Sequence, residues 1–146
     1  MQIIKRIPWV ALSVAIPLAI AVPGQAENPL HVEQLLTTGS CPLCDLSGAD
    51  LTQAHLIGAD LRFADLQGAN LTEANLEGAD LEGANLAEAN LTSAFLTHAN
   101  FTDANLDGAN LTQASLYFVE VAGASMENID LTSAEVVGTP ISIGGN

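Results

Sequence analysis

The stretch from residue 68 to residue 91, GANLTEANLEGADLEGANLAEANL, repeats its own pattern every five residues. A period of five matches neither the 3.6-residue period of an α-helix nor the two-residue period of a β-strand. A fixed short repeat is typical of a solenoid, whose units bury their apolar side chains only by stacking on neighbouring units. The stretch therefore predicts a repeat fold.

A leucine or phenylalanine marks the centre of each five-residue unit, and the pattern extends in both directions from the quoted stretch. An alanine stands two residues before every centre from Leu51 to Leu116, and aspartate or asparagine usually separates the two. The strong centres are Leu46, Leu51, Leu56, Leu61, Leu66, Leu71, Leu76, Leu81, Leu86, Leu91, Leu96, Phe101, Leu106, Leu111 and Leu116. Weaker centres follow at Val121, Met126, Leu131, Val136 and Ile141.

A second period of twenty residues lies inside the first. Threonines directly after a centre recur at this interval: Thr52, Thr72, Thr92, Thr112 and Thr132. Glycines at 48, 58, 68, 78, 108 and 138 fall on a ten-residue lattice. If twenty residues complete one turn, four units form the four sides of a coil, and the threonines mark one side.

This pattern resembles the pentapeptide-repeat family, whose unit is A(D/N)LXX, over residues 44–141. The resemblance implies an all-β solenoid, a right-handed quadrilateral parallel β-helix, with alanine and the centre residue pointing inward and the other three positions outward. Stacked turns would join backbone amides at a spacing of about 4.8 Å in about five turns. It also suggests an exported, cyanobacterial-type member.

The first 26 residues have the layout of a secretory signal peptide. Lys5 and Arg6 precede an apolar run, and small residues end it before an expected cleavage site between Ala26 and Glu27. The alternative is a retained membrane anchor, but the run is short for a spanning helix and contains Pro8 and Pro17. Export and cleavage are the favoured interpretation, with no stable membrane insertion afterwards.

The two ends of the repeat region require covers, because a solenoid leaves its terminal turns open. Residues 27–40 are expected to form a short N-terminal capping helix, with Asn28 as N-cap, Pro29 in the first turn and Gly39 at the stop. Its leucines, at positions 30, 35 and 36, are expected to lie over the first turn. Residues 41–141 form the predicted β-helix, and residues 142–146 a C-terminal tail.

The charge is strongly acidic, with 17 aspartates and glutamates against 3 lysines and arginines and a net charge of −14. Two of the three basic residues lie in the leader, so only Arg62 remains after cleavage. Such a surface disfavours direct binding to nucleic acid or to anionic lipid. It favours solubility, basic partners or imitation of a polyanion.

The motif CPLC contains both cysteines, Cys41 and Cys44. In the repeat frame Cys41 occupies a centre position and Cys44 an alanine position, so both are expected to point inward. A structural disulfide is the favoured interpretation, and buried free thiols or thiol redox activity are the alternatives. Two ligands do not complete a zinc site.

No catalytic, cofactor or metal site is predicted. The outward aspartates and asparagines are expected to hydrogen-bond nearby backbone at the turns, because the calcium-binding β-roll repeat is absent. Flat threonine faces can also order ice, but a single threonine rank favours a cross-strand ladder. No phosphate-binding loop or serine–histidine–aspartate set is found.

One outward cluster interrupts the small and polar pattern: Phe95, His98, Tyr117 and Phe118. On the twenty-residue lattice they fall on one side in two stacked turns, with Phe118 directly above His98. Outward aromatics on a polar rod indicate a contact surface for a partner or a second copy. The alternative is local packing over a loosened turn or under the C-terminal tail.

These observations favour a non-enzymatic structural or interaction module in the periplasm or thylakoid lumen. The resemblance implies one alternative, since some family members imitate DNA and bind gyrase, although a signal peptide would separate this chain from cytoplasmic gyrase. The other alternative is a thiol redox protein that uses CPLC. Neither the partner nor the oligomeric state follows from the sequence.

Overall fold

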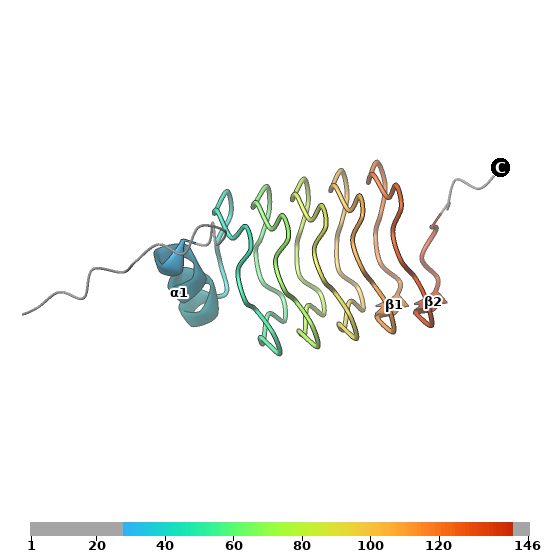
Figure 1. Ribbon diagram of the computed structural model, residues 1–146, viewed down its shortest axis with the longest axis horizontal. Helices are drawn as coiled ribbons and strands as arrows, with labels where there is room; N and C mark the ends of the chain where they lie inside the picture. The colour runs from blue at the N-terminus through green and yellow to red at the C-terminus, as the bar shows by residue number, and fades with distance from the viewer. Residues whose placement is uncertain (1–27, 142–146) are drawn as a thin grey trace, which may run out of the picture.

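The computed structural model describes residues 28–141, which form a rod-shaped coil with a helix at one end (Figure 1). The predicted signal peptide and the C-terminal tail after Ile141 lie outside the described residues. No helix in the described range is long and apolar enough to cross a membrane.

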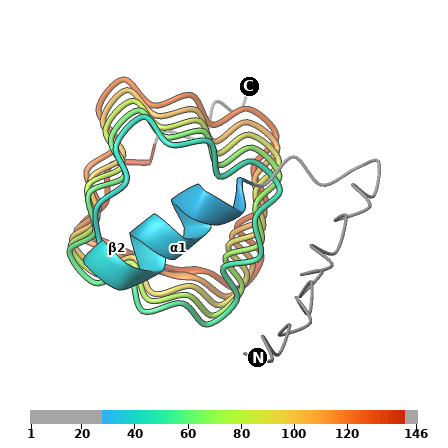
Figure 2. The ribbon, with the colours of Figure 1, turned by 90° about the vertical axis from the view of Figure 1, so that its left-hand side faces the viewer.

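The chain winds with twenty residues to a turn. Parallel bridges join residues twenty apart, from Ser40 with Asp60 to Asn110 with Asp130. Each centre from Leu46 to Leu111 donates its N–H to the next turn, as Leu71 does to the carbonyl oxygen of Asn90 at 2.7 Å. Viewed along its axis the coil has four sides (Figure 2). The twenty-residue period of the sequence is therefore the turn of the coil.

Pairing between turns is parallel, but extended strands are few. Among the described residues, strand β1 (Ser115–Tyr117) pairs with strand β2 (Glu135–Val137), with Ser115 opposite Glu135. Elsewhere each side contributes one bridging residue. A side holds only five residues, and a turn occupies most of them, so longer strands do not form.

The interior is built from the centre residues and the alanines that precede them. All centres from Leu46 to Leu116 are buried, and so are the alanines from Ala49 to Ala114 except the half-buried Ala54. Within residues 28–141 no polar or charged side chain is fully buried. The inward and outward assignment of the repeat positions is confirmed.

Each corner is a β-turn that begins at a centre residue. The N–H of Ala54 donates to the carbonyl oxygen of Leu51 at 3.0 Å, and the third residue of that turn, Gln53, has a φ of 57°. This left-handed conformation costs a side-chain-bearing residue about 1 kcal/mol or more, whereas glycine adopts it freely. The glycine lattice seen in the sequence therefore marks the positive-φ position of the corners.

Helix α1 (Pro29–Thr38) lies across the first end of the coil (Figure 2). The Oδ1 atom of Asn28 accepts the N–H of Leu30 at 3.1 Å, and Gly39 ends the helix with a φ of 68°. Leu35 is buried, but Leu30 and Leu36 are exposed. The expectation that all three leucines lie over the first turn is thus wrong for two of them.

The face of α1 that meets the coil follows the helical period. His31 and Val32 are half-buried and lie four and three residues before the buried Leu35, so the three side chains share one face of the helix. The Nδ1 atom of His31 lies 3.0 Å from the backbone N of Asp45 and accepts its proton. An imidazole therefore joins helix and first turn where a leucine was expected.

Candidate functional site

The aromatic cluster predicted from the sequence forms a column on one side of the rod. The rings of His98 and Phe118 are stacked, with centroids 5.6 Å apart and an interplanar angle of 16°. The Phe118 ring also lies over Gly138, so close that a Cβ atom added there would clash with it. Phe118 is therefore held between the turns before and after its own.

The other two members flank this column. Phe95 pairs through its backbone with Ser115 at the start of β1, and Tyr117 ends that strand. The Tyr117 hydroxyl donates a hydrogen bond to the Glu135 carboxylate, which raises the pKa of the tyrosine. Strands β1 and β2 are thereby joined through side chains as well as backbone.

Much of this aromatic cluster faces solvent. Phe95 is 50% exposed and Phe118 is 55% exposed, and His98 is exposed as well. Stacking covers part of the surface of the two rings and leaves the rest exposed to solvent. Whether a partner covers the cluster stays a prediction.

A groove of about 380 Å³ adjoins Phe118 at the C-terminal end of the rod. It is lined by Phe118, the 119–122 segment, Gly138 and Pro140. The sequence interpretation did not find it. Pro140 was the feature of the sequence that could have indicated it. The equivalent residue one turn earlier, Glu120, donates its backbone N–H to the carbonyl oxygen of Ala99 at 3.0 Å. Proline has no N–H with which to make this bond.

Other exposed apolar side chains lie apart from the aromatic cluster. The Phe63 ring occupies a different side and covers Gly83, much as Phe118 covers Gly138. Leu43, near α1, is 78% exposed, and sequence reasoning had not singled it out. Both residues occupy the corner position two after a centre, which points outward.

The outward aspartates and asparagines act within the turns, as expected. Asp50 Oδ1 accepts the backbone N–H of Thr52 at 3.1 Å and its hydroxyl at 2.6 Å. The hydroxyl bond holds the pKa of the Asp50 carboxyl below its usual value. The same motif recurs at Asn70, Asn90 and Asn110.

The threonine column extends this motif between turns. The Nδ2 atom of Asn70 donates to the Thr52 hydroxyl oxygen at 2.9 Å, and Asn90 does the same to Thr72 at 3.0 Å. Hydroxyls and amides therefore link three successive turns along this side. The hydroxyls of Thr52, Thr72, Thr92 and Thr112 all bond to aspartate or asparagine side chains of the protein, which favours a structural ladder over an ice-binding face.

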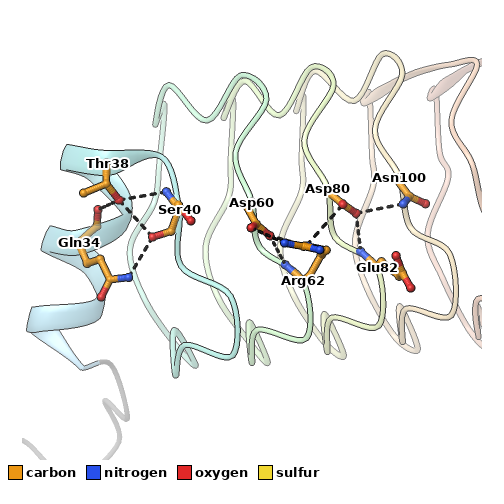
Figure 3. A network of polar contacts seen from close by, with 8 residues as sticks. All are labelled: Gln34, Thr38, Ser40, Asp60, Arg62, Asp80, Glu82 and Asn100. Carbon is orange, nitrogen blue, oxygen red and sulfur yellow. Dashed lines mark hydrogen bonds and ion pairs between the residues drawn. The ribbon is translucent and has the colours of Figure 1, made fainter.

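Arg62 stands between two carboxylates of successive turns (Figure 3). It binds Asp60 through two 2.8 Å contacts, and its Nε lies 3.7 Å from Asp80. Asp60 raises the pKa of the guanidinium, and the Arg62 side chain lowers the pKa of Asp60. Asp80 also accepts from Asn100 at 3.0 Å, so this side has its own polar ladder.

Cys41 and Cys44 form a disulfide in the first turn, with their Cα atoms 5.4 Å apart. Their exposures are 0% and 6%, and α1 lies across the same end of the coil. A thiol that attacks a substrate disulfide must be accessible, so this location disfavours redox catalysis. Within residues 28–141 no three histidine, cysteine or acidic side chains are placed to hold a metal.

We expect protein isolated from an oxidising compartment to contain the Cys41–Cys44 disulfide and to lack thiol–disulfide exchange activity. Its intact mass should be lower by two hydrogen atoms than after reduction, and alkylation without reductant should label neither cysteine. Because the closed loop is very short, its entropic stabilisation should lie below the roughly 3 kcal/mol of a 15-residue loop. Rapid reduction of insulin by the protein would contradict the structural role.

Comparison with known proteins identifies the repeat. The family profile for pentapeptide repeats matches residues 44–83 and 79–117, with 8 copies. The chain belongs to the pentapeptide repeat family. Pentapeptide repeat proteins fold as right-handed quadrilateral β-helices, in agreement with the four-sided coil of Figure 2. A search of curated proteins finds no match.

Solved pentapeptide repeat structures resemble the chain. A pentapeptide repeat protein from the thylakoid lumen of Arabidopsis thaliana shares 34% identity, with a TM-score of 0.52, over 75% of this chain and 74% of that one. A Cyanothece pentapeptide repeat protein shares 26% identity, with a TM-score of 0.35, over 76% of this chain and 97% of that one. HetL of Nostoc, a pentapeptide repeat protein involved in heterocyst differentiation regulation, shares 27% identity, with a TM-score of 0.31. The match covers 73% of this chain and 65% of HetL.

Proposed function

We propose that this pentapeptide repeat protein is a non-enzymatic interaction module that docks a protein partner on the cluster of Phe95, His98, Tyr117 and Phe118. The observation that supports it is the exposure of stacked aromatic rings on a rod whose other outward positions are mostly small or polar. Interface energy concentrates in aromatic anchors that a partner can desolvate. Pentapeptide repeat proteins are in general structural or interaction modules, which agrees with this role.

The rod would act as a rigid support for that cluster. We infer that α1 caps the N-terminal end and that residues 41–141 form a coil of about five turns at twenty residues each. The column of His98, Phe118 and Gly138 belongs to three successive turns, so its geometry is set by the coil itself. A partner would therefore meet a preorganised surface, which reduces the entropic cost of binding.

We further propose that the protein works outside the cytoplasm, in a periplasm or thylakoid lumen. Three observations support this location. The first 26 residues have signal-peptide layout, the Arabidopsis relative comes from the thylakoid lumen, and the chain contains a disulfide. Structural disulfides persist mainly in oxidising compartments.

Pull-downs from fractionated cells test the docking surface and the compartment together. The double variant Phe95→Ser/Tyr117→Ser should lose the partner, because it removes two aromatic side chains while leaving the buried interior unchanged. The matched control is Thr72→Ser/Thr92→Ser, which keeps the hydroxyls of the threonine column on another side of the rod. Circular dichroism should show that both variants remain folded.

One result would defeat the proposed surface. If the folded aromatic variant retains every partner and the oligomeric state of the parent protein, the cluster serves local packing only. Recovery of the protein and its partner from the cytoplasmic fraction would contradict the proposed location.

A further inference from the structure

Polar side chains link successive turns along three sides of the coil, whereas the fourth side lacks such links from residue 55 to residue 115. The links on the three sides run from Asn70 to Thr52 at 2.9 Å, from Asn85 to Asp65 at 3.0 Å and from Asn100 to Asp80 at 3.0 Å. The equivalent residues of the fourth side are His55, Asn75, Phe95 and Ser115. Within residues 28–141 no side-chain hydrogen bond joins these four to one another, and Asn75 bonds only to the N–H of Glu77 in its own turn. The outward side chains of this side are therefore free for other contacts.

This fourth side, which we call the aromatic side, comprises residues 55–58, 75–78, 95–98 and 115–118. Backbone hydrogen bonds keep its corners in register, as from Gly58 to Glu77 at 2.8 Å and from His98 to Tyr117 at 2.9 Å. Ile57 is 63% exposed and lies three turns before Tyr117. The exposed apolar surface therefore extends beyond the aromatic cluster, over about 14 Å at a turn spacing of about 4.8 Å.

The backbone of the aromatic side is already paired. The N–H of Phe95 donates to the carbonyl oxygen of Ala74 at 3.0 Å, and the carbonyl oxygen of Phe95 accepts the N–H of Leu76 at 2.9 Å. Asn75 and Ser115 are paired in the same way. Strand addition needs unpaired backbone groups, so an occupant has to bind through side chains. An amphipathic helix presents such a row of side chains, at i, i+4 and i+7.

Charge selects among the possible helices. Glu77 is exposed midway between Ile57 and the cluster, and within the described range its carboxylate has no hydrogen-bond or ion-pair partner. Neither lysine nor arginine occurs on the aromatic side. A second copy of the chain would bring the same carboxylate and a net charge of −14 against it, which is unfavourable. A partner with lysine or arginine beside its apolar row suits both the apolar surface and Glu77.

We propose that the aromatic side binds a basic amphipathic helix of a partner protein, aligned with the axis of the rod. This rests on the docking surface proposed above and extends it to Ile57. Apolar side chains of the helix contact Phe118 and Phe95 at one end and Ile57 at the other, and a lysine or arginine between them reaches Glu77. The pitch of an α-helix, about 5.4 Å, is close to the turn spacing, so successive helical turns meet successive turns of the coil.

A binding assay with defined peptides tests this. The probe is a fluorescent helical peptide of about sixteen residues, roughly 24 Å long, with leucines at i, i+4, i+7 and i+11 and lysine or alanine elsewhere. One control peptide has the same composition with its leucines spread around the helix, and another has glutamate in place of lysine. We expect saturable binding of the amphipathic lysine peptide, at least tenfold weaker binding of the permuted peptide and none of the glutamate peptide.

Variants of the protein locate the bound peptide. Ile57→Ser should weaken binding about tenfold, because it removes an apolar contact, and its control Leu43→Ser, on another side, should bind like the parent. Glu77→Lys should weaken binding about threefold to fivefold, and its control Glu88→Lys, half a turn away, should not. In an NMR titration the amide signals of the aromatic side should shift, and those of the threonine column should not. Circular dichroism should show that all variants are folded.

Failure of this inference is distinguishable from failure of the proposed function. If Phe95→Ser/Tyr117→Ser loses the cellular partner while Ile57→Ser and Glu77→Lys bind the peptide like the parent, the docking surface stands and its extension to Ile57 falls. Absence of binding to the lysine peptide, or equal binding of either control peptide, would overturn the helix proposal. A parent protein that sediments as a dimer, and becomes a monomer in Ile57→Ser, would assign the aromatic side to a second copy.

Discussion

Replacing Leu81 by lysine is expected to unfold the middle of the rod, whereas replacing Glu82 by lysine is expected to leave it folded. Leu81 has an exposure of 0% and donates its N–H to Asn100 of the next turn at 2.8 Å. An ammonium at this position would enter an interior in which no described polar side chain is fully buried to meet it. Burial of an unpaired charge should cost about 4 kcal/mol or more.

The neighbouring position is the matched control. Glu82 points outward, and its carboxylate lies near Arg62, where it contributes to the raised pKa of that side chain. Reversing its charge there should cost no more than about 1 kcal/mol. Urea unfolding followed by circular dichroism measures both variants. Similar midpoints for the two would show that the inward and outward positions are assigned wrongly.

Replacing Phe101 by alanine is the second change with a large expected effect. Phe101 heads the fully buried side chains by volume, with 1% exposure. Truncation leaves a cavity that the coil cannot close, because hydrogen bonds hold its backbone to the turns on both sides. The bond from Phe101 to Glu120 measures 2.7 Å, and the preceding residue, Asn100, donates back to Ala79 at 2.9 Å. The loss should be about 3–5 kcal/mol.

Phe63 provides the control with the same chemical change. Its ring is 56% exposed and lies over Gly83 on the outside of the coil. Truncation to alanine therefore removes little buried area, and its cost should stay below about 1 kcal/mol. Both free energies of unfolding come from the same urea titration. A loss for Phe63→Ala that equals the loss for Phe101→Ala would contradict the distinction between interior and surface aromatics.

Sequence reasoning reached most of the coil because each residue's environment repeats with its position in the unit. The spacing of alanine and leucine identified the buried set, and the threonines at twenty-residue intervals identified the turn. Sequence reasoning also placed Phe118 above His98, since residues twenty apart occupy equivalent positions in successive turns. The placement of Phe118 over His98 is confirmed, and the structure adds that their rings are stacked.

The sequence-based predictions failed in the segments that do not follow the five-residue repeat. In α1 the buried face is selected by contact with the first turn, so Leu35 is buried while Leu30 and Leu36 face solvent. The groove near Phe118 is lined by Pro140, which has no N–H to donate to the preceding turn. Neither outcome follows from the five-residue period, because each depends on how a segment outside the repeat pattern packs against the coil.

The sequence by itself determined the five-residue unit, the twenty-residue turn, the interior columns and the inward positions of both cysteines. These follow from a pattern that every unit repeats, and a coil whose turns bond to each other admits only that register. Only the tertiary structure decided which way the outward side chains lean and which face of α1 meets the coil. The Phe118 ring, which lies over Gly138, illustrates this. The direction in which such a ring points along the coil axis depends on the space that the residue one turn later leaves for it.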